Sequence, residues 1–333
     1  MAATRLDRRL DDLRIRSVKH LCLLMGTDPR ELDSICAGID INPVKFYRFR
    51  TVHRNGKSRA LATPVGRLRD ILSRLNRHLQ RFEFPDYMHG GLRGRSTKTY
   101  ALPHVRRKSV LKSDLKDFFP SIRPGRVYDT FLKLGCTPDV AHYITRLTTV
   151  NGQLPQGSPT STVVAALVSI GMAVRLRGLA DFVDGHSGTF VDDLALSGPP
   201  WVGRFRSTVR RIIRQERLTP NDLKTVVVKS SEEQVIAGVR VNHGLDAPKT
   251  KVHEVRALIE QLHLDVADGK SPDLSVLRSI RGKIQHVDSL NRGAAHSLTR
   301  RLARALEGDS AEINHTVSGN SSGIRRQPSL QRH

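Results

Sequence analysis

The chain has 333 residues, of which 55 are Lys or Arg and 32 are Asp or Glu, so its formal net charge is +23. This length allows one large domain or two modest ones with a buried core, and it excludes a small disulfide-stabilised scaffold. Such an excess of positive charge indicates a polyanionic partner. The three cysteines, Cys22, Cys36 and Cys136, form no Cys-x-x-Cys pair, which argues against a disulfide framework and a cysteine zinc site.

The sequence shows neither a membrane span nor an export signal. The longest apolar run, Val163 to Val174, has 12 residues. A span needs roughly 18, so this run predicts a buried helix instead. The N-terminal apolar cluster, Leu21 to Met25, is shorter than the roughly 7–15 residues of a signal-peptide core. We therefore expect a cytoplasmic protein with no membrane partner.

The N-terminal part of the chain predicts helices and then a β-hairpin. Leucines and an isoleucine recur among charged residues within residues 3–37, which predicts two opening helices, assigned as an N-terminal helical segment over residues 1–40. From Lys45 to Ala62, two strand-like runs flank an Asn-Gly pair, a strong hairpin signal. After Pro64, apolar residues at helical spacing alternate with arginines, so we expect a helix with one packed and one cationic face.

Strand and helix signals then alternate to about Gly238 and give way to a helical region. Val110 to Asp114 predicts a short strand, and a helix is expected to begin after Pro124. From Lys249 to Leu306, apolar stripes predict a separate helical subdomain. Residues 308–333 contain almost no large apolar side chains, so we expect a disordered tail there.

The sharpest local feature is a pair of adjacent acids, Asp192 and Asp193, within the apolar, strand-like stretch from Phe190 to Leu196. Adjacent carboxylates in such surroundings repel each other and lose solvation. A hairpin tip is a natural place to hold the pair, and a divalent cation would offset the repulsion. The alternative is that the two residues simply form a turn.

Two further segments could carry chemistry, and each has a plain structural alternative. In Lys112 to Ile122, Asp114 closes a strand signal and two aromatic residues follow. A strand-end Asp is also a common helix or turn cap. Leu154 to Ser161 is a Pro/Gly-rich loop that leads into the apolar helix, where Ser158 or Thr160 could merely be the cap.

These three segments occur in the order and at the spacing found in bacterial reverse transcriptases, which the chain resembles. Phe190 to Asp193 is similar to the family's aromatic-x-Asp-Asp box, Asp114 to Ile122 to its DLKDFFPSI box, and Leu154 to Ser161 to its LPQGxPxS box. The resemblance covers roughly residues 45 to 290. It also includes these segments: Gly56 to Arg59, His89 to Ser96, Asn221 to Lys224 and Ala237 to Asn242.

The resemblance implies the catalytic residues and their cofactor. Asp114, Asp192 and Asp193 would be catalytic, and with the carbonyl of Leu115 they would hold two Mg²⁺ ions. In two-metal phosphoryl transfer, one ion activates the primer hydroxyl and the other binds the triphosphate and the leaving oxygen. Hard oxygen ligands of this kind suit magnesium.

Five further residues match the family's nucleotide-binding positions. Phe119 falls at the steric gate, where a ring under the incoming sugar selects dNTPs, although a core aromatic is the alternative. Gln156 and Gly157 correspond to the loop along the nascent base pair. Arg59 corresponds to the fingers arginine that clamps the triphosphate. Lys224 corresponds to a lysine that assists the leaving pyrophosphate, with a solvated surface lysine as the alternative.

The fold implied by the resemblance is an α+β right-hand polymerase. Fingers and a palm with an antiparallel sheet would occupy residues 41–248, and a helical thumb residues 249–307. Arg93, Arg95 and His104 are expected to contact the RNA template.

The expected function is that of an RNA-directed DNA polymerase bound to an RNA template and its RNA/DNA hybrid. The compact size, the DLKDFFPSI form and the loop around Arg95 most resemble retron reverse transcriptases. That subclass implies a cognate structured non-coding RNA, a separate effector protein and antiphage defence. Where retrons usually carry NAxxH, this chain has Tyr100 to His104 without the Asn.

Three alternatives remain open at this level. The first is a group II intron-like or other stand-alone bacterial reverse transcriptase. The second is an RNA-templated RNA polymerase, against which Phe119 at the steric gate argues. The third is a catalytically silent RNA-binding protein on the same scaffold, against which the retained Asp114, Asp192 and Asp193 argue.

Overall fold

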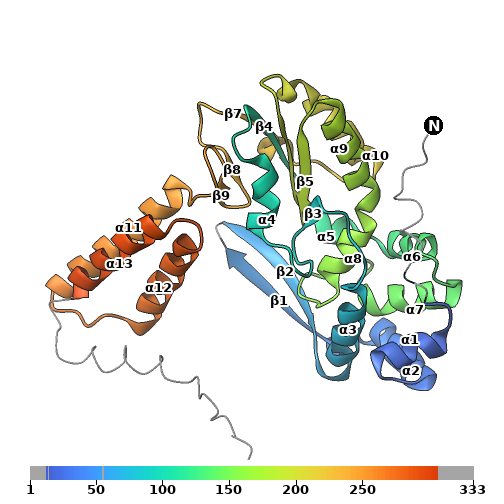
Figure 1. Ribbon diagram of the computed structural model, residues 1–333. Helices are drawn as coiled ribbons and strands as arrows, with labels where there is room; N and C mark the ends of the chain where they lie inside the picture. Colours follow the sequence, from blue (N-terminus) through green and yellow to red (C-terminus); the bar gives the residue numbers. More distant parts are fainter. Residues whose placement is uncertain (1–12, 14, 55, 307–333) are drawn as a thin grey trace, which may run out of the picture. The chain divides into compact units, whose positions relative to one another are not determined.

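The computed structural model describes residues 13, 15–54 and 56–306. The chain divides after Gly244 into two compact units, each of which is described by itself below (Figure 1). The start of the predicted N-terminal segment and the predicted tail over residues 308–333 lie outside the described residues.

Helices and one hairpin form the N-terminal part of the first unit, as predicted. In chain order the elements are α1 (Val18–Met25), α2 (Pro29–Ile41), the 3-10 turn η1 (Pro43–Lys45), β1 (Tyr47–Arg54), β2 (Lys57–Pro64) and α3 (Gly66–Leu79). Ser17 and Asp28 cap α1 and α2 by accepting hydrogen bonds from backbone amides. β1 and β2 pair antiparallel with Arg54 opposite Lys57, which confirms the predicted hairpin.

A five-stranded sheet lies at the centre of the first unit. Its strands, in spatial order, are β3 (Met88–His89), β5 (His186–Phe190), β6 (Asp193–Gly198), β4 (Ser109–Asp114) and β7 (Val226–Lys229). β3 pairs parallel with β5, and every other pair in this sheet is antiparallel. A largely antiparallel sheet combined with many helices confirms the predicted α+β class.

Helices and short turns surround this sheet, and Figure 1 shows α9 and α10 along one side of it. These helices and turns are α4 (Thr97–Ala101), η2 (Leu102–His104), α5 (Phe118–Ser121), α6 (Pro124–Lys133), α7 (Pro138–Thr148), α8 (Ser161–Val168), α9 (Ile170–Phe182), η3 (Val202–Phe205), α10 (Arg206–Gln215) and η4 (Asp222–Lys224). Two short strands, β8 (Val235–Ile236) and β9 (Val239–Arg240), pair antiparallel in a separate two-stranded sheet. α6 begins at Pro124 itself, one residue before the predicted start, because proline fits the first turn of a helix.

The apolar run over residues 163–174 predicts one helix, but the structure divides it into α8 and α9, which are bent by 54°. Ser169 lies at the break, where its hydroxyl donates a hydrogen bond to the Ala165 carbonyl. Such a bond competes with the helical N–H for the same carbonyl and bends helices. Among the described residues, no single helix is long and apolar enough to cross a membrane, and only this bent pair meets the length and composition criteria together.

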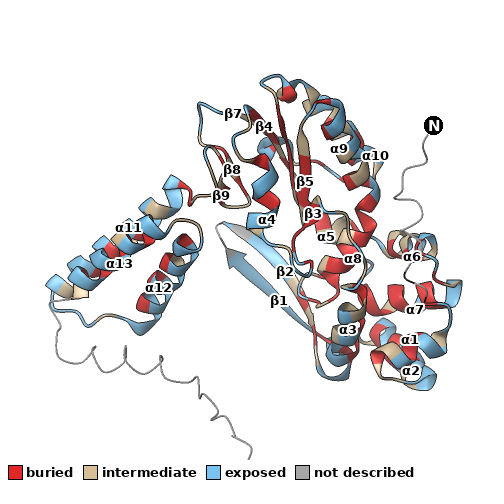
Figure 2. Ribbon diagram, viewed as in Figure 1, coloured by how far each residue is buried: buried red, intermediate tan, exposed pale blue. Residues whose placement is uncertain are grey.

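One apolar core runs through the first unit. Figure 2 shows buried residues along the strands and on the inner sides of the surrounding helices. Leu21 of α1, Tyr47 of β1 and Leu111 of β4 are all buried members of this core. The N-terminal helices, the hairpin and the sheet therefore form one folded body.

The second unit consists of three helices with a core of its own. They are α11 (Lys249–Ala267), α12 (Leu274–Asp288) and α13 (Arg292–Leu306). Val255, Ile280 and Leu298 are buried at the centre of this bundle. The side-chain amide of Asn291 donates to the carboxylate of Asp246 at 2.7 Å, which ties the start of the unit to α13. The helices predicted for this region are present, and their function as a thumb stays a prediction.

Candidate active site

Three acidic residues from distant parts of the sequence meet at one end of the central sheet. Asp114 is the last residue of β4 and lies opposite Asp193, the first residue of β6. Asp192 precedes Asp193 in the turn between β5 and β6, and its carbonyl accepts the Leu115 N–H at 2.9 Å. The structure thus brings together the acids that the sequence singled out.

The turn that carries Asp192 is tight and strained. Phe190 pairs with Asp193, which leaves only Val191 and Asp192 between the strands. Val191 has a φ of +57°, a conformation that β-branched residues rarely adopt. Such strain persists only where the surroundings hold it in place.

Gly90 packs directly against this turn, and sequence reasoning missed the contact. A Cβ atom added to Gly90 would lie 2.6 Å from the backbone nitrogen of Val191, so a larger residue would displace the turn. The sequence contained one signal, the Gly90-Gly91 pair in a basic loop, but it did not indicate the partner of that loop. The loop therefore helps to fix the position of Asp192.

Burial and neighbouring charges raise the pKa of both acids of the pair. Loss of solvation raises the pKa of Asp193 to about 6, with Lys112 opposing the shift and Asp192 adding to it. Loss of solvation also raises the pKa of Asp192, helped by the charge of Asp114 and opposed by Arg59. Both carboxylates are therefore destabilised as anions, and a nearby cation would stabilise them.

Asp114 is held by side chains of the turn η4 and of Asn221, the residue that precedes it. Lys224 Nζ lies 2.6 Å from one carboxylate oxygen, and the Asn221 amide donates to the other at 3.3 Å. The backbone N–H of Asn221 also donates to the Asp114 carbonyl at 2.7 Å. Lys224 is thus an ion-pair partner of the candidate active site, although its side chain is 46% exposed.

The oxygen donors of this site suit magnesium, but the side chains are not arranged to bind a metal ion without some rearrangement. Carboxylate and carbonyl oxygens are hard ligands that Mg²⁺ prefers. Within the described part of the chain, no group of three or more His, Cys, Asp or Glu side chains is placed to hold a metal ion. One Asp114 oxygen is engaged by Lys224, so a cation at that oxygen would have to displace the lysine.

The loop predicted to lie along the nascent base pair contacts the β1–β2 hairpin. The Ala62 N–H of β2 donates to the Gln156 carbonyl at 2.7 Å. Gly157 has a φ of +105°, and a Cβ there would lie 2.9 Å from the Thr63 hydroxyl. Only glycine combines this conformation with such a close approach. Arg59, on the same strand, is exposed, and its charge acts on Asp192.

The two aromatic residues that follow Asp114 have different surroundings. Phe118 is only 4% exposed and is part of the core. Phe119 is half-buried, with its ring centroid 5.6 Å from that of Phe118. Phe118 therefore belongs to the core, while Phe119 packs against the core and keeps part of its surface exposed. Its function as a steric gate stays a prediction.

Arg93 and Arg95, predicted to contact RNA, lie in the loop that follows Gly90. Arg93 is exposed, and its backbone N–H donates to the Gln80 side chain at 2.9 Å. The Arg95 guanidinium donates to two backbone carbonyls, at 2.6 and 3.2 Å, and so braces a neighbouring loop segment. Arg93 is the freer of the two for an external ligand.

His104, the third residue predicted to contact RNA, lies in the core. Its side chain is 1% exposed, and its Nδ1 lies 2.6 Å from the Ser197 hydroxyl. Burial lowers its pKa to about 3, so the ring is neutral. This position favours a structural role over the predicted RNA contact.

Comparison with known proteins adds two kinds of similarity. No protein-family model matches the chain. Among solved structures, telomerase from Candida albicans in complex with a fragment of telomeric RNA aligns with a TM-score of 0.44 and 11% identity, over 80% of this chain and 56% of that chain. The foamy viral protease-reverse transcriptase in complex with double-stranded DNA aligns with a TM-score of 0.43 and 14% identity, over 79% and 43% of the respective chains.

Sequence comparison finds relatives at higher identity. Retron Mx65 reverse transcriptase of Myxococcus xanthus is 31% identical over 278 residues, which cover 77% of this chain and 64% of that protein. Retron Se72 reverse transcriptase of Salmonella heidelberg is 27% identical over 247 residues, covering 71% of this chain and 65% of that protein. The chain is related to retron reverse transcriptases. Retron Ec86 reverse transcriptase of Escherichia coli is also 27% identical, over 73% of this chain and 77% of that protein.

This relationship confirms the resemblance drawn from the sequence motifs. The chain spans somewhat less than two thirds of the length of the first two relatives, 64% and 65%.

Proposed function

We propose that the chain is an RNA-directed DNA polymerase, which extends a primer hydroxyl with dNTPs on an RNA template. The observation that carries this proposal is the meeting of Asp114, Asp192 and Asp193 at one end of the sheet, with Lys224 on one side. The relationship to retron reverse transcriptases supports the same activity.

Asp114 and Asp192 would hold two Mg²⁺ ions, with the Leu115 carbonyl assisting and Asp193 close by. When bound, the ions would activate the primer hydroxyl and neutralise charge on the triphosphate. Lys224 neutralises part of the Asp114 charge in the free protein. Once displaced from Asp114, its ammonium would remain close enough to stabilise the negative charge of the leaving pyrophosphate.

The remaining predicted residues would bind and select the nucleotide. Arg59 projects from β2 as an exposed guanidinium, a group that binds phosphate oxygens through paired hydrogen bonds. Gln156 and Gly157 would support the incoming base pair from their loop against β2. Phe119 would contact the sugar and exclude a 2′-hydroxyl, so DNA would be the product.

The partners of this polymerase would include a cognate structured non-coding RNA and a separate effector protein in antiphage defence. A net charge of +23 supports a nucleic-acid partner, because neutralising phosphates and releasing counterions supplies much of the affinity for such a ligand. The cytoplasmic location stays a prediction.

Primer extension with magnesium tests the activity. Wild-type protein is expected to yield product from dNTPs but not from rNTPs, and Asp192→Ala/Asp193→Ala is expected to abolish it. The control Asp70→Ala/Asp129→Ala removes two exposed acids elsewhere and should retain activity. Product from rNTPs alone would indicate an RNA polymerase. Undiminished product from the Asp192→Ala/Asp193→Ala variant, or no product even on RNA that co-purifies from the native host, would contradict the proposal.

A further inference from the structure

Three aromatic side chains gather on the outside of the first unit, where α9 ends and α10 begins. The Phe205 ring lies 6.0 Å, centroid to centroid, from both Phe182 and Trp201. Phe182 is 76% exposed and Trp201 is 42% exposed. Phe205 packs against the core of the unit, so the cluster has a fixed base and two exposed rings.

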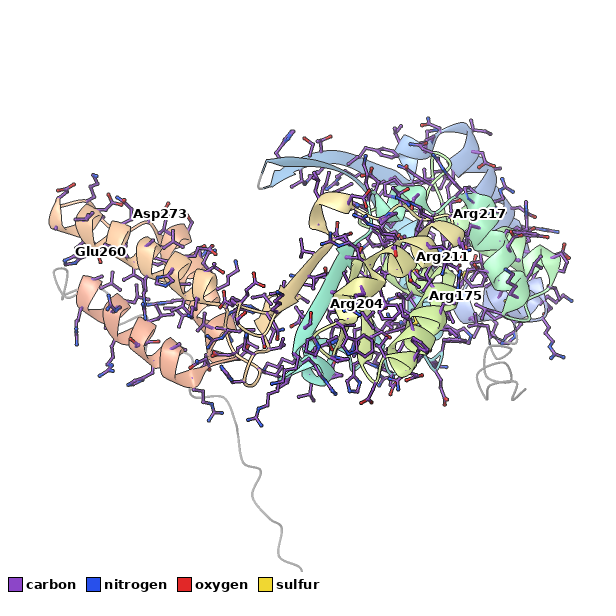
Figure 3. The ribbon with its side chains drawn as sticks, turned by 90° about the horizontal axis from the view of Figure 1, so that it is seen from above. Arg175, Arg204, Arg211, Arg217, Glu260 and Asp273 are labelled. Atoms are coloured by element: carbon purple, nitrogen blue, oxygen red, sulfur yellow. The ribbon has the colours of Figure 1, made fainter. Side chains whose placement is uncertain are left out.

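Arginines dominate the same surface. Six of the fourteen residues from Arg204 to Arg217 are arginine, and only Glu216 among them is acidic. Figure 3 shows Arg204, Arg211 and Arg217, together with Arg175 of α9, along one side of the first unit. Arg204 stands between Trp201 and Phe205 in the sequence of the turn η3, so positive charge and aromatic rings share one surface.

Several of these arginines are free to bind an external anion. The nearby acids Glu216 and Asp222 already form ion pairs with other arginines. In the part of the chain that the structure describes, Arg204, Arg211 and Arg217 form no ion pair. Arg204 and Arg211 are also exposed, so their charge is available to phosphates.

The aromatic part of this surface lies away from the candidate active site. β6 begins at Asp193 and ends at Gly198, which corresponds to a length of about 17 Å. Trp201 follows three residues after the far end of this strand. A ligand on the aromatic cluster would therefore leave the acidic end of the sheet free.

We propose that the α9–α10 face, formed by Phe182, Trp201, Phe205, Arg204 and Arg211, binds single-stranded polynucleotide. Exposed aromatic rings stack on unpaired bases, while guanidinium groups contact the backbone phosphates, and single-stranded nucleic acid offers both. A duplex hides its bases from such rings. The inference rests on the proposed polymerase function for the source of the strand, which is either the RNA template or the DNA product.

The fluorescence of Trp201 tests the proposal directly, because Trp201 is the only tryptophan of the chain. Full-length protein is titrated with a uridine RNA of about 12 nucleotides, a thymidine DNA of the same length and an RNA duplex of the same length, without nucleotides or magnesium. We expect quenching by a single strand and weaker binding of the duplex. The RNA and DNA arms distinguish template from product as the natural occupant.

Two variants and a control assign the effect to this face. Arg204→Glu/Arg211→Glu is expected to weaken binding about tenfold or more at low salt and to reduce the salt slope by about 2. Phe182→Ala removes one stacking ring and should weaken binding about fivefold or more. Lys19→Glu/Arg30→Glu makes the same charge change on exposed positions of α1 and α2, and it should alter affinity by no more than about twofold.

Three outcomes would overturn the proposal. The first is unchanged Trp201 fluorescence with every oligonucleotide, which is the result expected if the face binds a protein. The second is an equal loss of single-strand affinity in Arg204→Glu/Arg211→Glu and in Lys19→Glu/Arg30→Glu. The third is tighter binding of the duplex than of either single strand. The result is independent of the proposed activity, because no synthesis occurs in the titration. Primer extension by Arg204→Glu/Arg211→Glu on a short primed template is expected to match that of wild type, which separates loss of this face from loss of the active site.

Discussion

Asp193 destabilises the folded chain whenever it is ionised. Burial raises its pKa from 3.8 to about 6, so the folded state binds this proton more tightly than the unfolded chain does. Stability therefore falls as the pH rises from about 4 to about 6, and it stays lower above that range. A shift of this size corresponds to about 3 kcal/mol, which a bound cation would offset.

Asp193→Asn is therefore expected to raise the free energy of unfolding by about 1–3 kcal/mol at about pH 8 in the presence of a chelator. At about pH 4 the variant and the wild type should differ little, because the carboxyl group is then protonated in the folded state. Urea denaturation at both pH values measures the difference. Asp70→Asn, at an exposed position of α3, is the control, and an equal gain at both pH values would contradict this explanation.

His104 produces the opposite pH dependence. Burial lowers its pKa to about 3, so below about pH 6.5 the unfolded chain binds a proton that the folded chain does not. Stability is lost as the pH falls, by about 2 kcal/mol between about pH 6.5 and pH 5. The free energy of unfolding of His104→Leu should fall less than that of the wild type over this interval. This holds even if losing the hydrogen bond to Ser197 makes the variant less stable at about pH 6.5. Urea denaturation across the interval checks this, with exposed His142→Leu as the control that should behave like wild type.

At the scale of elements, the loop around Gly90 is expected to control the turn that carries Asp192. Gly90 and Gly94 have nearly the same positive φ, +74° and +73°. Alanine at either position costs about 1–2 kcal/mol for that conformation. A Cβ at position 90 would also lie 2.6 Å from the Val191 nitrogen, whereas nothing lies within 4 Å of a Cβ at position 94.

Gly90→Ala is therefore expected to reduce primer extension by tenfold or more, since a displacement of about 1 Å at reacting groups has effects of this order. Gly94→Ala should reduce it far less, at a similar loss of thermal stability from backbone strain. Single-turnover extension and thermal unfolding of both variants provide the measurement. Equal extension rates would show that the contact with Val191 does not position Asp192.

Elements could be predicted from the sequence where their signals are local. The Asn-Gly pair predicted the β1–β2 hairpin, and Pro124 predicted the start of α6 to within one residue. Asp114 pairs with Asp193 across two strands that are distant in the sequence, so local sequence patterns could not predict this pairing. The break at Ser169 also escaped prediction, because composition alone does not show which carbonyl a serine hydroxyl will take.

The candidate site was predictable where a motif marks it and unpredictable where packing decides. The acids and the Gln156 loop were found because they occur in recognisable boxes. The ion pair of Lys224 with Asp114 could not be predicted, since spacing alone cannot distinguish a paired lysine from a solvated one. The function of Lys224 at the leaving pyrophosphate stays a prediction. The burial of His104 results from tertiary packing, which the local sequence around this residue does not indicate.

At the scale of the whole molecule, two separate cores predict two separate unfolding events. The core of the first unit includes Leu72, and that of the second includes Ile280, and both side chains are fully buried. A unit with its own core can unfold as a cooperative element of its own. Calorimetry of the full chain is therefore expected to show two transitions.

Matched core variants should assign these transitions. Leu72→Ala and Ile280→Ala each remove a buried aliphatic side chain, at a cost of about 2–5 kcal/mol to the unit concerned. Leu72→Ala should lower only the transition of the first unit, and Ile280→Ala only that of the three-helix unit. A shift of both transitions in either variant, or a single transition throughout, would show that the two cores unfold as one, because a lesion in an independent unit leaves the other unit's stability unchanged.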